Sequence, residues 1–230
     1  MLLAIDTSTA QIGLALYDGA SVPGELVWHS GLHHTEELAP ALADLLRRVG
    51  IKMDAITALG VALGPGSFTS LRVGLAFVKG LVLARHIPLV GIPTLDVVAA
   101  AVPLPDPSVP QKRRRRLAAV VQAGRGRLAR GWYRAENSAW LPVGPVAVTT
   151  VAELAEQILE PVIVCGEMSG DERSQLLKMN DRVSLASPAQ CVRRPAILAE
   201  LAWRKWQSGK TDLAATLAPI YIHVAGGLPA

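Results

Sequence analysis

The chain has 230 residues, of which 50% are hydrophobic and 18% are charged, a composition that excludes extended disorder. Its two cysteines, Cys165 and Cys191, exclude a disulfide framework and a four-thiolate zinc site, so we expect buried free thiols. The formal net charge is +4, but residues 112–116 supply five positive charges in one run. Removing those five from the 23 basic residues leaves 18 against 19 acidic ones, which excludes a basic surface over the whole fold.

The N-terminal residues predict neither a signal peptide nor a membrane span. The apolar run at the start ends at Asp6, and no basic segment precedes it. The most apolar stretch, residues 73–84, contains Lys79 and is shorter than the roughly 20 residues that a span needs. With so few cysteines, this pattern predicts a cytoplasmic protein.

The first fifty residues predict three strands and a helix. Residues 2–6 are apolar up to an aspartate, and residues 12–16 alternate with the period of a strand. Asp18-Gly19 is typical of a hairpin turn, after which residues 26–30 return as a third strand. The predicted helix 35–49 has glutamates in its first turn and arginines in its last, as the helix dipole favours.

The next fifty residues predict two crossover units. Residues 58–63 form an apolar strand, and the turn at 64–67 leads into a helix over residues 67–85. Residues 89–92 form a buried strand, and another helix begins at about Thr94. The order βββαβαβα predicts a hairpin-led mixed sheet with parallel crossovers.

Residues 103–116 contain four prolines and the basic run, and we expect them to form a linker. We therefore expect a first lobe over 1–102 and a second lobe over 117–230, whose late helix could pack back on the first. The second half again places strands before helices, which indicates a duplicated fold. Its predicted strands cover 117–121, 128–134, 140–143 and 162–164, and its predicted helices cover 151–159, 170–178 and 195–207.

Asp6 ends the first predicted strand, and the hydroxyl residues Thr7, Ser8 and Thr9 follow it. A carboxylate and hydroxyl groups at such a turn could hold a magnesium ion and a phosphate. The same side chains could instead satisfy the backbone of an Asx-type turn. The sequence leaves both roles open.

The turn that precedes the helix 67–85 is a candidate anion site, because free N–H groups at a helix N-terminus bind anions. A tight turn with a serine N-cap is the alternative, and the missing Gly-Lys-Ser/Thr excludes a P-loop. The neighbouring pair His33-His34 has no further ligands nearby, so we expect exposed loop histidines and no metal site. The candidate anion-binding residues are Gly64, Gly66, Ser67 and Thr69.

The helix 67–85 is apolar around most of its circumference, with Arg72 and Lys79 on a narrow polar edge. Such a helix must be covered on two sides, and the helix 35–49 also carries two apolar stripes. A crowded core within the chain would explain both helices. A helical patch that pairs with a partner or a second copy would do so too. For that patch we predict Leu38, Leu42, Leu45, Ser70, Gly74, Phe77 and Leu81.

The stretches 4–9, 34–35, 64–74, 79–81 and 91–95 together resemble the TsaB (YeaZ) family, and the resemblance covers about residues 1–100. It implies an actin-like, two-lobed α/β fold, of the superfamily that includes sugar kinases and DnaK-type chaperones, in which each lobe is a mixed sheet with helices. The late segment 218–222 is similar to the family's Pro-x-Tyr segment.

The resemblance also implies a role in bacterial tRNA threonylcarbamoyladenosine synthesis, which modifies the adenosine next to the anticodon. Proteins of this family are its dimerisation subunit: they pair with the catalytic TsaD subunit, and the ATPase subunit TsaE joins the complex. We expect a homodimer when TsaD is absent, no cofactor, and tRNA contact that is indirect or weak. Such contact would run through Lys112, Arg113, Arg114, Arg115 and Arg116.

Two positions argue against catalysis by this chain. Catalytic relatives carry two histidines, four residues apart, that hold a metal, and alignment on Gly91-Ile92 places Thr94 and Val98 there. Gln122 stands where the superfamily usually has an aspartate. Asp6, Thr7, Ser8 and Gln122 are then positions of a degenerate nucleotide site. The alternatives are a sugar-kinase-type phosphotransferase that uses Asp6 and magnesium, and a metallopeptidase-like protein, which would lack its two histidines.

Overall fold

The computed structural model describes all residues except 31–32, 107, 109, 111–114 and 223–230. The chain divides into two compact units. The first comprises Met1–Val97 and Arg194–Ile220, and the second comprises Val98–Arg193 and the chain from Tyr221. The last helix of the expected second lobe, 117–230, therefore lies in the first unit.

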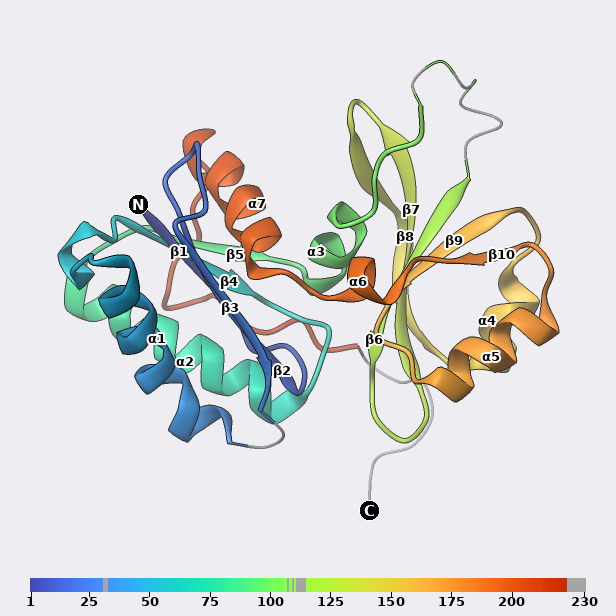
Figure 1. Ribbon diagram of the computed structural model, residues 1–230, viewed down its shortest axis with the longest axis horizontal. Coiled ribbons are helices and arrows are strands. Elements are labelled where there is room, and N and C mark those ends of the chain that lie inside the picture. Colours follow the sequence, from blue (N-terminus) through green and yellow to red (C-terminus); the bar gives the residue numbers. More distant parts are fainter. Residues whose placement is uncertain (31–32, 107, 109, 111–114, 223–230) are drawn as a thin grey trace. The chain divides into compact units, whose positions relative to one another are not determined.

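The first unit is built on a five-stranded sheet of order β3-β2-β1-β4-β5 (Figure 1). Strand β2 pairs antiparallel with both β1 and β3, whereas β1, β4 and β5 run parallel, as the predicted element order requires. The strands are β1 (Leu2–Asp6), β2 (Gln11–Tyr17), β3 (Gly24–His29), β4 (Ala58–Ala62) and β5 (Leu89–Ile92).

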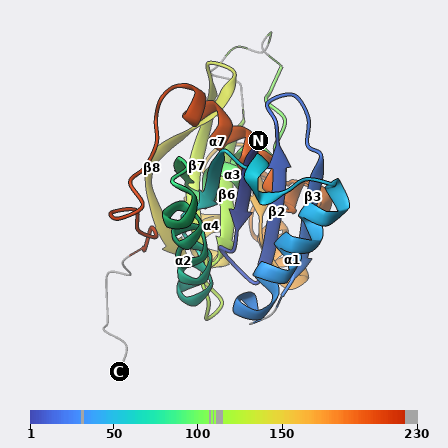
Figure 2. The same ribbon diagram turned by 90° about the vertical axis from the view of Figure 1, so that its left-hand side faces the viewer.

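Helices cover both faces of this sheet (Figures 1 and 2). Because side chains alternate along a strand, Leu3 and Ile5 of β1 pack under α1 and α2, whereas Leu2 and Ala4 pack under α7. The α1 and α2 helices lie side by side on their face. The helices of this unit are α1 (His34–Val49), α2 (Phe68–Arg85) and α7 (Pro195–Gln207), with a 3-10 turn at Met53–Ala55. The helix α3 (Thr94–Ala100) begins in this unit and ends in the second.

The second unit has a five-stranded sheet of order β10-β9-β6-β7-β8. One face of it packs against α4 and α5 around a core that includes Val120, Leu154, Val164 and Leu176. The strands are β6 (Arg116–Gln122), β7 (Leu128–Glu136), β8 (Ala139–Thr149), β9 (Val162–Gly166) and β10 (Val183–Leu185). The helices are α4 (Val151–Gln157), α5 (Gly170–Met179) and α6 (Pro188–Cys191).

The end of the expected linker belongs to the sheet. Arg116 opens β6 and lies 3.8 Å from the carboxylate of Glu160, and Arg115 donates to the hydroxyl of Ser184 at 2.8 Å. The remaining members of the predicted tRNA-contacting run, residues 112–114, lie outside the described residues. Within the part of the chain that the structure describes, no helix is long and apolar enough to cross a membrane.

Candidate functional site

The turn after β1 is a buried polar cluster. Asp6, Thr7, Ser8 and Thr9 are each at most 6% exposed. The Oδ1 atom of Asp6 accepts hydrogen bonds from the backbone N–H of Ser8 at 2.8 Å and from its hydroxyl at 2.7 Å. This is the geometry of an Asx-type turn. It favours a structural role for this carboxylate over the coordination of magnesium.

The glycine-rich turn before α2 packs directly onto that cluster. The backbone N–H of Ser67 donates to the carbonyl oxygen of Ser8 at 2.7 Å. A Cβ atom at Gly66 would lie 2.0 Å from the same oxygen, so only glycine permits this approach. The Ser67 hydroxyl accepts from the backbone N–H of Ser70 as the N-cap of α2. These hydrogen bonds favour the tight-turn interpretation over an anion site. The fourth candidate residue, Thr69, is exposed.

Thr94, at the start of α3, joins the turn after β1 to the turn after β4. Its hydroxyl accepts from the backbone N–H of Gly64 at 2.9 Å and shares a 2.7 Å hydrogen bond with the hydroxyl of Ser8. Thr94 is fully buried, and Val98 is 3% exposed. The Thr94 hydroxyl is already engaged in hydrogen bonds, and the Val98 side chain has no atom that can coordinate a metal. These two residues therefore do not form a metal site where catalytic relatives carry two histidines. In the described ranges, no group of three or more His, Cys, Asp or Glu residues could hold a metal ion.

His34 departs from the prediction of an exposed loop. It is the first residue of α1 and is 3% exposed, because its ring turns toward the β1–β2 turn. Its Nε2 atom lies 2.8 Å from the carbonyl oxygen of Thr9, which can only accept a hydrogen bond. His33 is exposed, as predicted. The cluster around Asp6 therefore also fixes the start of α1.

Gln122 lies at the end of β6 in the second unit. Its amide donates to Oε2 of Glu172 at 2.8 Å. Glu172 also forms a capping box with Ser169 at the start of α5, because its carboxylate accepts from the backbone N–H of Ser169 at 2.6 Å. Gln122 thus supports a helix start. The predicted nucleotide site combines Gln122 of the second unit with Asp6, Thr7 and Ser8 of the first. That combination stays a prediction.

The outer surface of α1 and α2 carries an exposed groove of about 510 Å³. Phe68 on its wall is 53% exposed, and the guanidinium carbon of Arg72 lies 3.7 Å above the centre of its ring. Ala39 and Ala76 are exposed in the same groove. The groove is lined by His34, Thr35, Leu38, Ala39, Phe68, Thr69, Arg72, Val73, Ala76 and Phe77.

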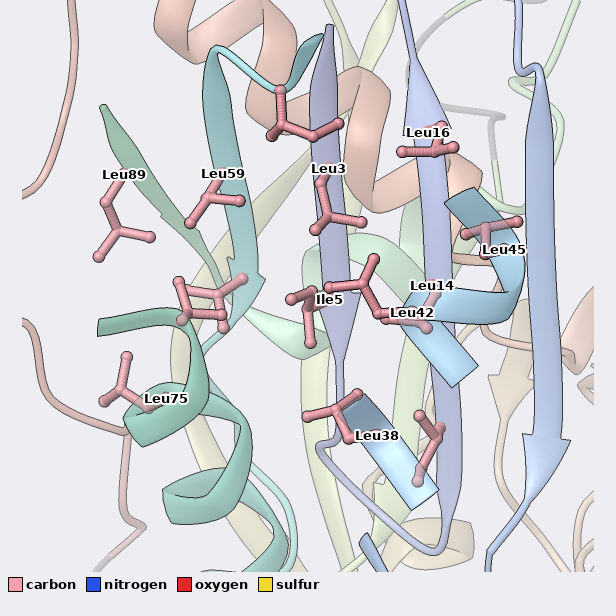
Figure 3. Close-up of a cluster of buried hydrophobic side chains, with 14 residues drawn as sticks. Leu3, Ile5, Leu14, Leu16, Leu38, Leu42, Leu45, Leu59, Leu75 and Leu89 are labelled. Atoms are coloured by element: carbon pink, nitrogen blue, oxygen red, sulfur yellow. The ribbon is translucent and has the colours of Figure 1, made fainter. Parts of the chain in front are cut away.

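The predicted interface residues lie mostly on the wrong side of their helices. Leu38, Leu42 and Leu45 are at most 5% exposed and point from α1 to the sheet (Figure 3). Ser70 is buried, and a Cβ atom at Gly74 would lie 2.1 Å from the hydroxyl oxygen of Thr7. These five residues belong to the unit's own interior, which corrects the prediction. Half-buried Phe77 and Leu81 pack against the core, and of the predicted residues Leu38 and Phe77 also line the groove.

The family profile described as "TsaD: tRNA N6-adenosine threonylcarbamoyltransferase" matches residues 29–184. The tRNA threonylcarbamoyladenosine biosynthesis protein TsaB of Escherichia coli is 30% identical over 167 residues, which cover 71% of this chain and 64% of that protein. Its namesake from Bacillus subtilis is 27% identical over 231 residues, which cover 97% and 94%. The chain thus spans slightly less than two thirds of the first relative and almost all of the second.

Solved structures agree on the fold. YeaZ from Pseudomonas aeruginosa superposes with a TM-score of 0.76 at 23% identity, covering 96% of this chain and 99% of that chain. The ethanolamine utilization protein EutJ from Carboxydothermus hydrogenoformans gives a TM-score of 0.52 at 14% identity, covering 86% and 88%. At these identities the likeness establishes the fold alone, which is the predicted actin-like α/β fold.

The family profile covers more than half of the chain. The fold and the profile together define the class: an actin-like protein of the tRNA threonylcarbamoylation families. Within that class, the two TsaB relatives cover 71% and 97% of this chain, and the chain belongs to the TsaB (YeaZ) family, as its motifs predicted.

Proposed function

We propose that this chain is a scaffold subunit that pairs with a TsaD-like transferase in the threonylcarbamoylation of tRNA and is not itself the catalyst. The observation that carries the proposal is the exposed groove on α1 and α2, whose apolar wall includes Phe68. An apolar hollow on the outside of two adjacent helices suits the insertion of partner side chains. The pathway is the one for which its TsaB relatives are named, tRNA threonylcarbamoyladenosine biosynthesis.

The buried polar cluster supports a non-catalytic role. A nucleotide or metal site needs a carboxylate and hydroxyl groups that can reach a ligand. The Asp6 carboxylate instead accepts hydrogen bonds from Ser8. The Thr94 hydroxyl accepts one from Gly64 and shares another with the Ser8 hydroxyl. The Gln122 amide donates a hydrogen bond to the Glu172 carboxylate. These residues hold the ends of strands and helices in place. No comparison favours a phosphotransferase or a metallopeptidase instead.

The partner of the groove is the equivalent helical surface of a TsaD-like subunit, and a second copy of this chain takes that place when TsaD is absent. The contact surface comprises the outward side chains of Ala39, Phe68, Arg72 and Ala76. A TsaE-like ATPase joins the assembled pair in the cytoplasm.

The test is co-purification with the TsaD-like protein encoded in the same genome. The two full chains are expressed together, with an affinity tag on the TsaD-like protein, and the mass of the eluted complex is measured by light scattering. We expect a complex that contains both chains. Elution of the tagged protein alone, with this chain folded and monomeric in the flow-through, would remove the basis of the proposal.

A further inference from the structure

Two cysteines that are far apart in the sequence meet in the second unit. Cys165 lies on β9 and is 1% exposed, and Cys191 is the last residue of α6 and is half-buried. Their sulfur atoms are 3.9 Å apart, and both thiols are free. A disulfide needs a sulfur–sulfur distance of about 2.05 Å, so a shift of about 2 Å would join them. The four-residue helix α6 carries the more accessible sulfur.

The surroundings of Cys191 suit a thiolate. The backbone N–H of Gly166 points at its sulfur at 3.4 Å, and Nη1 of Arg173 on α5 lies 3.7 Å away. A second bond, from Nη2 of Arg173 to the carbonyl oxygen of Ala186 at 2.7 Å, holds the guanidinium in this position. The nearby Arg193 is paired with Glu167 and so adds little further charge. A positive group and an N–H donor beside a thiol favour its ionised form.

The pKa values of the two thiols shift in opposite directions. The hydrogen bond from Cys165, followed by the Gly166 N–H and Arg173, lowers the pKa of Cys191, although burial opposes this shift. The same hydrogen bond, and then burial, raises the pKa of Cys165. One sulfur is therefore prepared to attack as a thiolate while its neighbour stays protonated, which is the division of labour in reactive dithiols.

We propose that Cys165 and Cys191 form an oxidation site for hydroperoxides, in which Cys191 reacts first and Cys165 resolves the product into a disulfide. This proposal is independent of the proposed function, because it uses only side chains of the second unit, which contains neither α1 nor α2. The ligand class is a small peroxide such as hydrogen peroxide, which is small enough to approach a half-buried sulfur.

Both steps balance. The Cys191 thiolate attacks one oxygen of hydrogen peroxide, a sulfur–oxygen bond forms, the oxygen–oxygen bond breaks, and hydroxide leaves. This step oxidises the sulfur to a sulfenic acid by two electrons and reduces the peroxide. The sulfur of Cys165 then displaces the sulfenic oxygen, the sulfur–sulfur bond forms, and water leaves with the Cys165 proton. A cellular thiol would return the pair to the reduced state by exchange.

The first experiment measures which thiol reacts. The full chain is alkylated with iodoacetamide at pH 7, and each cysteine peptide is quantified over time by mass spectrometry. An ordinary thiol with a pKa of about 8.5 is about 3% ionised at this pH, so lowering the pKa by one unit raises the thiolate fraction roughly eightfold. We expect Cys191 to react at least about tenfold faster than Cys165. Equal rates in the folded chain would overturn the proposal.

Arg173 provides a charge control for the same measurement. Arg173→Gln should slow the alkylation of Cys191 several-fold, whereas Arg173→Lys, which keeps the positive charge, should retain most of the wild-type rate. A merely structural role for Arg173 would move both variants together. In that case the assignment of Cys191 as the attacking thiolate fails.

The second experiment follows the disulfide. After hydrogen peroxide treatment, non-reducing peptide mapping should show a crosslink between the peptides of Cys165 and Cys191 that a reductant reverses. Cys165→Ala, or Cys165→Ser if the alanine variant unfolds by circular dichroism, should instead accumulate a sulfenic acid on Cys191 that dimedone traps. Absence of the crosslink, or a crosslink only between separate molecules, would overturn the proposal.

Discussion

Gly74 allows α2 to pack closely against the end of β1. It lies on α2 against Thr7, whose hydroxyl donates to the carbonyl oxygen of Ser70 at 2.8 Å. A Cβ atom at this position would meet the hydroxyl oxygen and both carbons of the Thr7 side chain. The start of α2 can therefore lie this close to the end of β1 only because residue 74 has no side chain.

Gly74→Ala should destabilise the isolated chain by about 1–3 kcal/mol, the usual result of adding a methyl group to a packed interior. Gly80→Ala on the same helix is the matched control. No atom lies within 4 Å of a Cβ at Gly80, so the better helix propensity of alanine should stabilise the chain by about 0.5–1 kcal/mol. Thermal unfolding followed by circular dichroism measures both. Equal responses of the two variants would show that Gly74 is not packed against Thr7.

The sequence named the residues of the polar cluster without deciding what they do. Asp6, Ser8 and Ser67 were predicted as candidates for two alternative roles, and the choice depended on contacts between residues up to 86 positions apart, such as Ser8 with Thr94. No local spacing encodes such a contact. The exposed location predicted for His34 was wrong for the same reason, since its partner is the carbonyl oxygen of Thr9.

At the scale of elements, apolar periodicity predicted the strands and long helices of both units. It could not tell which stripe of α2 faces the sheet, because a helix with apolar residues on two sides has no single inward face. The structure buries Leu71, Leu75 and Val78, while Phe68 and Ala76 remain exposed. The sequence also missed β10 and α6, which are three and four residues long and too short to show a period.

The outward stripe of α2 carries the prediction for the interface. Ala76→Glu places a charge in the groove, and burying an unpaired charge in a packed contact costs several kcal/mol. Since about 1.4 kcal/mol is a tenfold change in affinity, binding to the TsaD-like protein should weaken by at least about tenfold. Isothermal titration measures this loss, with circular dichroism to confirm that the variant is folded.

Leu177→Glu on α5 is the control for that variant, because Leu177 is 50% exposed and lies in the other unit. It adds the same charge to a helix surface and should bind the TsaD-like protein like the wild type. If Ala76→Glu also binds like the wild type, the groove on α1 and α2 is not the contact surface.

The helix α7 belongs to the first unit although the segment Val98–Arg193 of the second unit precedes it in the sequence. It covers the sheet face formed by Leu2, Ala4 and Val90, with Leu198 and Ala202 fully buried. Arg194, just before the helix, pairs with Glu25 of β3. The sequence predicted the helix and allowed it to pack back on the first lobe. Its pattern did not specify the sheet face that the helix covers.

Leu198→Ala should therefore cost about 2–5 kcal/mol of unfolding free energy, as for other buried leucines. It should also speed amide hydrogen exchange in β1 and β5, although more than a hundred residues separate them from α7. Leu177→Ala removes the same atoms from an exposed position and should change stability by less than about 0.5 kcal/mol. Unchanged exchange in β1 would show that α7 does not cover this sheet.

The basic run makes a separate, charge-based prediction. Arg115 and Arg116 already contact Ser184 and Glu160. Replacing Arg113 and Arg114 by alanine should leave unfolding unchanged. If both contact tRNA phosphates, the log–log salt dependence of tRNA binding by the complex should weaken by up to about two units, one for each lost contact. An unchanged slope, measured by filter binding between low and moderate salt, would exclude tRNA contact by these two residues.

The most direct test of the proposed scaffold role is reconstitution of tRNA modification. The purified chain, the TsaD-like and TsaE-like proteins of the same genome, tRNA and a threonylcarbamoyl donor are combined with each protein omitted in turn, and modified adenosine is quantified by mass spectrometry. We predict that this chain alone forms no modified adenosine and that the TsaD-like protein forms it efficiently only when this chain is present. Modification by this chain alone, or undiminished modification without it, would contradict the proposed scaffold role.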